Sequence, residues 1–200
     1  MSMTNTQTNT QAEIVRIKKD ALVAGDVIAT RSHTMSSTGV RVATGARVSH
    51  AILYTGAKQG LQQAVDAMPE KGVTKDILRN KLKQVSYVVV FRHRTATTEQ
   101  CARACAWAEV QALVHKPYDY RSAARVGIVP YTNVGQLIII ADEIDAKLSP
   151  EGEDASFMCS ELVFRAFEIA GAPLTNKPAY CMGPGMLFKT DRLSCIGRLA

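Results

Sequence analysis

Three side chains in this sequence are of the types that thiol chemistry uses. Cys159 lies in the stretch 156–163, which reads SFMCSELV. His50 is the polar exception in the apolar segment 47–56, and Asp66 is the single acid of the next apolar segment. A cysteine nucleophile needs an imidazole that pairs with its thiolate and later protonates the leaving group, and a polar group that fixes the imidazole tautomer. Together the three residues could therefore form a site for acyl chemistry.

Each of these residues also has a purely structural interpretation. A cysteine is commonly a small core residue. A histidine within an apolar segment is more often a hydrogen-bonded core residue than a catalytic one. The residue types alone leave both interpretations open, so the elements that would position them have to be considered.

The residues after Cys159 have the pattern of an amphipathic helix. Apolar residues recur at three- and four-residue spacing as far as Ala170, and Gly171 is a natural helix stop. Ser156 and Asp154 are both suitable N-caps, which predicts that Cys159 lies in the first turn. There, free backbone N–H groups and the positive end of the helix dipole stabilise an anion such as a thiolate.

The other two candidates are predicted to lie on strands. The segment 47–56 reads as a buried strand that carries His50, and 61–68 as the next strand, which carries Asp66. Neighbouring strands can place the two side chains together, and a helix packed on the sheet can bring Cys159 to the histidine.

Further elements follow from local signals in the chain. A Gly-Asp turn leads into a strand at 27–30, and 85–91 is the clearest strand, rich in β-branched and aromatic residues. Helices are predicted from the Thr97 capping box to about His115, over 134–148, and briefly over 76–82. The last residues, 194–199, read as a short edge strand. His33 is expected in a loop, and His93 and His115 at the surface.

Length and composition indicate one globular domain. The chain has 200 residues, of which 46% are hydrophobic and 21% charged. We expect a disordered polar tail at 1–13 and a single domain over 14–200. No apolar run is long enough to span a bilayer, and the N-terminus lacks the features of a secretory signal, so a cytoplasmic location is predicted, with signal-independent export left open.

The cysteine count and the net charge bear on disulfides, on metal binding and on nucleic-acid binding. Five cysteines at irregular spacings argue against a disulfide framework. Cys101 and Cys105 are predicted to pack in a core, since no second ligand pair accompanies them, and no metal or cofactor is expected. The net charge of +6 is spread along the chain and does not alternate with aromatics, so nucleic acid is not an expected partner.

At these residues the sequence resembles a known family. The motifs are GDVI at 25–28, SHAILY at 49–54, VDA at 65–67 with Gly72-Val73, and CSELV at 159–163. They resemble the circularly permuted NlpC-type papain-like proteins, the YiiX-like group, in which the histidine strand precedes the cysteine helix.

The resemblance implies a fold and three residue roles. The fold is α+β, with a small antiparallel sheet packed against helices. Cys159 is matched to the nucleophile, His50 to the general base, and Asp66 to the third polar residue. A backbone N–H at Cys159 would help to hold the oxyanion.

The predicted function is a cysteine peptidase or amidase that forms a thioester intermediate, with cell-wall peptide fragments as the first substrate guess. One alternative is a lipid acyltransferase or thioesterase of the lecithin-retinol acyltransferase type. The other is a non-catalytic binding module on the same fold. The partner is accordingly a small peptide, a muropeptide or an acyl lipid. The loop 32–45 and the segment 173–185 are the candidates to border the site.

Overall fold

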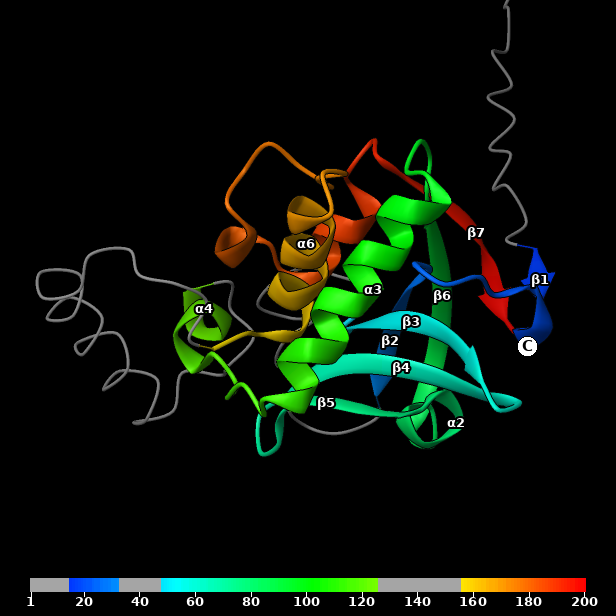
Figure 1. Cartoon of the computed structure of the whole chain (residues 1–200), viewed down its shortest axis with the longest axis horizontal. Coiled ribbons are helices and arrows are strands. Elements are labelled where there is room, and N and C mark those ends of the chain that lie inside the picture. The colour runs from blue at the N-terminus through cyan, green and yellow to red at the C-terminus, as the bar shows by residue number, and fades with distance from the viewer. Residues whose placement is uncertain (1–14, 33–47, 126–155) are drawn as a thin grey trace, which may run out of the picture.

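A mixed seven-stranded β-sheet forms the centre of the protein (Figure 1). The computed structural model describes residues 15–32, 48–125 and 156–200. Within them the strands are β1 (Arg16–Ile17), β2 (Val27–Ser32), β3 (His50–Lys58), β4 (Leu61–Met68), β5 (Gly72–Ile77), β6 (Val85–His93) and β7 (Leu193–Leu199). The helices are α2 (Leu78–Lys81), α3 (Thr98–Leu113), α4 (Tyr120–Arg125) and α6 (Cys159–Ile169), with 3₁₀ turns η1 (Lys19–Ala21), η2 (Ala179–Cys181) and η3 (Pro184–Phe188).

The strand order is β1-β7-β6-β2-β3-β4-β5, and only the β1–β7 pair is parallel. Strands β3, β4 and β5 form a meander in which Leu53 is opposite Val65, and Asp66 is opposite Thr74. Strand β2 joins this meander to β6, because Thr30 is opposite His50 on one side and Val88 on the other. The register therefore puts the first residue of β3 near the middle of the sheet.

The two faces of the sheet carry separate hydrophobic clusters. One cluster packs strand residues such as Ala51, Leu53 and Val65 against α3 and α6, which lie side by side over that face (Figure 1). The smaller cluster on the opposite face includes Ile52 and Leu78. Alternation along a strand puts His50 on the same side as Ile52.

The two long helices begin at defined caps. At α3 the Thr97 hydroxyl accepts from the backbone N–H of Gln100, and the Gln100 side chain accepts from the N–H of Thr97. This confirms the predicted capping box. At α6 the N-cap is Met158, not Ser156 or Asp154 as predicted, because the helix begins directly at Cys159.

Most predicted strands are present, and the differences have physical reasons. Strand β5 was missed because its outward residues are polar, and the predicted helix 76–82 is confined to α2 as a result. Strand β7 is not an edge strand, since the two residues of β1 pair along its outer side. The sheet is also larger than expected and not wholly antiparallel.

Several predictions fall on parts of the chain that the structure does not describe. These are the tail 1–13, most of the loop 32–45 with His33, and the helix 134–148. Among the described histidines, His115 is exposed as predicted. His93 is buried, with 8% exposure, because its ring stacks on Phe167 of α6.

Candidate active site

Cys159 is the first residue of α6, and its side chain is buried. It is 2% exposed, and its neighbours Phe157 and Met158 are fully buried. The Glu161 carboxylate accepts a hydrogen bond from the backbone N–H of Met158 at 3.2 Å. The start of the helix is thereby fixed, and Cys159 lies among the first-turn N–H groups, which have no partner within the helix.

His50 connects Cys159 to the sheet. As the first residue of β3 it retains 20% side-chain exposure, and its Nε2 atom lies 2.9 Å from Oδ2 of Asp66. The Cys159 side chain lies close enough to the imidazole for its negative charge to raise the pKa of His50. Because Nε2 is engaged by the carboxylate, Nδ1 is the ring nitrogen left for the thiol. The carboxylate thus holds the ring, with the side chain of Cys159 near it.

Asp66 is held by two further residues. Its side chain is 4% exposed, and Oδ1 accepts from Nζ of Lys81 at 2.6 Å and from the Thr74 hydroxyl at 3.1 Å. Lys81 is itself 6% exposed and donates to both the hydroxyl and the carbonyl oxygen of Thr74, each at 3.1 Å. The carboxylate thus bridges a cation on α2 and the imidazole on β3.

The charges in this cluster shift the pKa values of the histidine and the aspartate in opposite directions. Burial lowers the pKa of His50, but the negative charge of Cys159 and the hydrogen bonds to Asp66 and Cys159 raise it to about 10. For Asp66, burial raises the pKa, while His50 and Lys81 lower it to about 2. At neutral pH the cluster therefore favours an imidazolium beside an aspartate carboxylate.

A tyrosine-containing segment borders the cysteine. Tyr118 forms an isolated bridge with Phe157, and the backbone N–H of Asp119 donates to the carbonyl oxygen of Phe157 at 3.1 Å. Burial raises the pKa of Tyr118, and the nearby Cys159 raises it further, so the phenol remains protonated. Asp119 caps α4 through the N–H groups of Arg121 and Ser122.

The other four cysteines lie in different surroundings. Burial raises the pKa of the Cys105 thiol to about 12 and also raises that of Cys101, which fits their predicted role in packing. Cys181 and Cys195 are exposed. In residues 15–32, 48–125 and 156–200, no three His, Cys, Asp or Glu side chains gather as a metal ion would require.

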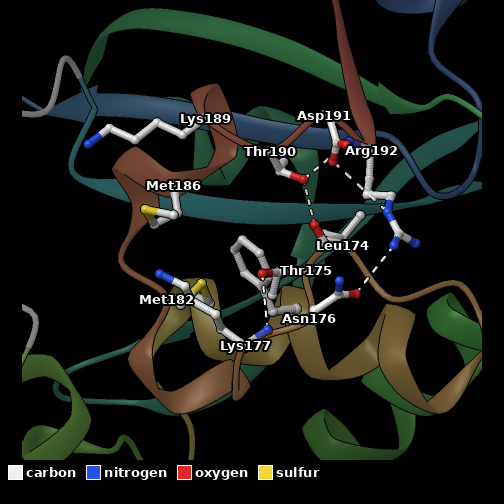
Figure 2. A pocket seen from close by; sticks show the side chains of 11 residues that line it. Leu174, Thr175, Asn176, Lys177, Met182, Met186, Lys189, Thr190, Asp191 and Arg192 are labelled. Atoms are coloured by element: carbon white, nitrogen blue, oxygen red, sulfur yellow. Dashed lines mark hydrogen bonds and ion pairs between the residues drawn. The ribbon is translucent and has the colours of Figure 1, made fainter.

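A separate pocket of about 340 Å³ lies where residues 174–192 pack on α6 (Figure 2). Its wall includes Phe164 and Met186, with the amines of Lys177 and Lys189 at its rim. Among its lining residues, the Thr190 hydroxyl donates to the Leu174 carbonyl oxygen at 2.5 Å. The segment 173–185 therefore borders this pocket, which none of the three candidate catalytic residues lines.

The structure brings together all three residues singled out in the sequence. It adds Lys81 and Thr74, which the sequence did not point to. Thr74 follows Val73 on strand β5, which was not predicted. In the sequence, Lys81 resembles an ordinary surface residue of a short helix. A lysine whose ammonium turns inward has no signature in the sequence.

Comparisons with known proteins identify relatives of this chain. No protein-family model matches it. It is 28% identical over 192 residues to a protein of Escherichia coli K12 named as the probable lipoprotein peptidase YaeF, a match that covers 89% of this chain and 67% of YaeF.

The fold is similar to a solved structure from Escherichia coli O157:H7, described as the metalloprotein yiiX. The TM-score is 0.59 at 16% identity, with 88% of this chain and 96% of that one covered. The chain thus has the mixed α+β fold of yiiX, and both similarities agree with the resemblance to the YiiX-like group. No helix in the described parts of the chain is long and apolar enough to cross a membrane.

Proposed function

We propose that this protein is a cysteine hydrolase that cleaves amide bonds, with Cys159 as nucleophile, His50 as general base and acid, and Asp66 as the residue that orients the imidazole. The observation that carries the proposal is the 2.9 Å hydrogen bond between His50 and Asp66, beside a Cys159 side chain whose charge acts on the same imidazole. The name of YaeF, a probable peptidase, supports the same reaction class.

The proposed reaction has two halves. The Cys159 thiolate attacks the amide carbonyl carbon, a C–S bond forms, and the negative charge on the carbonyl oxygen is met by the backbone N–H of Cys159. The tetrahedral intermediate collapses as the C–N bond breaks, and His50 gives its proton to the departing amine. A water molecule then loses a proton to His50 and attacks the thioester carbon. The C–S bond breaks, the acid is released, and His50 returns the proton to the sulfur.

The proposed architecture is a single permuted papain-like domain of the NlpC type over residues 14–200. Its support is the chain order, in which the histidine strand β3 comes before the cysteine helix α6. Cell-wall peptide fragments are the proposed substrates, in keeping with the proposed cytoplasmic location, where the enzyme would meet fragments and not the intact wall.

The test is a turnover screen with the purified chain. Muropeptides and acyl-ester reporters would be compared, and intact-mass spectrometry would look for a covalent acyl group on the protein. Cleavage of muropeptides that is lost in Cys159→Ala and kept in Cys181→Ala, an exposed cysteine, supports the proposal. Turnover of acyl esters alone would favour the lipid acyltransferase alternative, and turnover that survives Cys159→Ala would refute the assigned nucleophile.

A further inference from the structure

The cluster at the active site ends in a buried cation whose role neither the relatives nor the reaction scheme assigns. The side chain of Lys81 is 6% exposed, which is unusual for a lysine. Its ammonium group has three N–H donors, and the three contacts to Asp66 and Thr74 account for all of them. The ammonium group of Lys81 therefore has no donor left for a ligand.

We propose that Lys81 is a positioning residue that holds Asp66 in place and balances its charge, so that proton transfer from Cys159 to His50 takes place in a cluster of zero net charge. This inference rests on the proposed function of the Cys159 and His50 pair.

The charge balance follows from the order of the groups. With thiol and neutral imidazole, only Asp66 and Lys81 are charged, and they cancel. After the proton has moved from sulfur to nitrogen, the four groups alternate as anion, cation, anion and cation, and the sum is again zero. A buried site tolerates such an internal transfer far better than a net charge.

Removing the ammonium group of Lys81 would leave the cluster with one more negative charge and would raise the pKa of His50. The Asp66 carboxylate would face His50 without a counter-charge, and the imidazolium would be held more strongly. An imidazole that binds its proton more tightly is a weaker proton donor to the leaving amine. Lys81 therefore moderates the effect of Asp66 on the histidine, in addition to fixing its position.

Apart from Lys83, the other titratable groups near the cluster are the same in every variant considered below. Tyr118 lies beside Cys159 with Glu161 close to it, and Asp76 lies near both Lys81 and Lys83 at the protein surface. Lys83 is exposed and provides a control, since Lys83→Met removes an equal charge from the same part of the chain without touching Asp66.

The experiment is an NMR titration of the His50 imidazole. It is done in the Cys159→Ala background, which removes the neighbouring sulfur and brings the titration into an accessible pH range. Only four histidines are present, and His50→Gln identifies the resonance. We expect Lys81→Met to raise the His50 midpoint by about one pH unit. Lys81→Arg and Lys83→Met should leave it within about 0.3 units, a small fraction of that Coulomb shift.

Lys81→Gln separates charge from hydrogen bonding and replaces Lys81→Met if the latter does not fold. Its amide can still donate to Asp66, so we expect the same rise in the midpoint. A midpoint that stays unchanged or falls in the folded Met or Gln variant would overturn the inference, because a merely structural lysine would alter stability and not this midpoint. The result is independent of turnover, so it is distinguishable from a failure of the proposed hydrolase activity.

Discussion

The protons of His50 are affected in opposite directions by Asp66 and by the leaving group of the proposed reaction. Asp66 at Nε2 favours the imidazolium, while the proposed reaction requires Nδ1 to release a proton to the leaving group. Both effects are compatible with the geometry, because the Asp66 carboxylate also accepts hydrogen bonds from Lys81 and Thr74, which weakens its hold on the imidazolium. We therefore expect the reactivity of the site to depend on how the charge of Asp66 is shared between His50 and Lys81.

Replacing Asp66 tests its role as an orienting residue. Asp66→Asn retains an oxygen that can accept from His50 but loses the charge that stabilises the imidazolium. We expect a fall in kcat/KM of roughly 10- to 1000-fold, smaller than the loss in Cys159→Ala. The measurement is the rate of substrate cleavage for both variants side by side. Equal losses would mean that the carboxylate takes part more directly in the reaction.

The shifted pKa of Asp66 also predicts a pH dependence of stability. Because its pKa falls from 3.8 to about 2 on folding, the ionised carboxylate stabilises the native protein by roughly 2 kcal/mol above pH 4. This contribution is lost as the pH falls from about 4 to about 2. Urea unfolding of the wild type and of Asp66→Asn over this range should show a smaller pH dependence in the variant. Parallel curves would contradict the shift.

The pKa shift of His50 has the opposite sign to that of Asp66, and it affects stability in a different pH range. Its pKa rises from 6.5 to about 10 on folding, so its contribution is complete below pH 6.5 and is lost as the pH rises towards 10. In His50→Gln, the free energy of unfolding should fall less between about pH 7 and about pH 10 than in the wild type. The same loss in both proteins would show that the histidine does not hold its proton in this way.

Part of this cluster could be read from single residues in the sequence. His50 and Asp66 stood out because each is a polar residue at an inward position of an apolar segment. Lys81 did not, since its burial arises from the path of α2 across the end of β5, which depends on tertiary packing. Tyr118 reaches Cys159 only because the chain from α3 returns to Phe157, far away in the sequence.

At the scale of elements, the turn before β5 fixes how the meander meets the end of α3. Gly72 has φ +66°, and a Cβ atom there would lie 2.3 Å from the carbonyl oxygen of Lys116. The next residue, Val73, donates its N–H to the same oxygen at 2.8 Å. A close approach of two backbones therefore requires glycine at this position.

A pair of glycine variants separates backbone strain from steric clash. Gly60 also has a positive φ, +75°, but a Cβ atom added there would meet no other atom within 4 Å. Gly60→Ala should cost about 1 kcal/mol from the backbone conformation alone, and Gly72→Ala at least about 2 kcal/mol more because Lys116 must move. Thermal and denaturant unfolding measure both. Similar losses in the two variants would show that the contact with Lys116 is not tight.

Elements were predictable where a local pattern was strong. The capping box of α3 and the apolar segment of β4 both located their elements closely. Strand β5 was missed because four of its residues, Thr74 to Ile77, are not fully buried, which leaves little hydrophobic pattern. The place of β7 inside the sheet depends on β1, a two-residue pairing between distant parts of the chain that no local signal marks.

At the scale of the whole molecule, the site depends on segments that are distant in the sequence. Cys159, His50 and Lys81 come from α6, β3 and α2. Strand β3 belongs to the sheet, and the two helices pack against it (Figure 1). The sequence order of histidine before cysteine could be read directly. Their contact could be predicted only through the resemblance to a known family, since spacing along the chain carries no such information.

A single domain predicts one cooperative unfolding transition. Trp107 is the only tryptophan, and its ring lies 5.4 Å from that of Phe157, beside the segment that leads to Cys159. Its fluorescence therefore reports the region around α3 and α6, while far-ultraviolet circular dichroism reports the sheet as well. We expect the same midpoint by both probes in urea. Two separate midpoints would show that the helices and the sheet unfold independently.

The central claim is that His50 activates Cys159, and alkylation with iodoacetamide at neutral pH tests it most directly. Exposure alone would favour Cys181 and Cys195, because Cys159 is only 2% exposed. We nevertheless expect Cys159 to react fastest of the five cysteines, as followed by peptide mass spectrometry, and His50→Ala to slow it by at least about tenfold. Equal labelling of all five cysteines in the folded protein, or a rate at Cys159 that His50→Ala leaves unchanged, would contradict the claim.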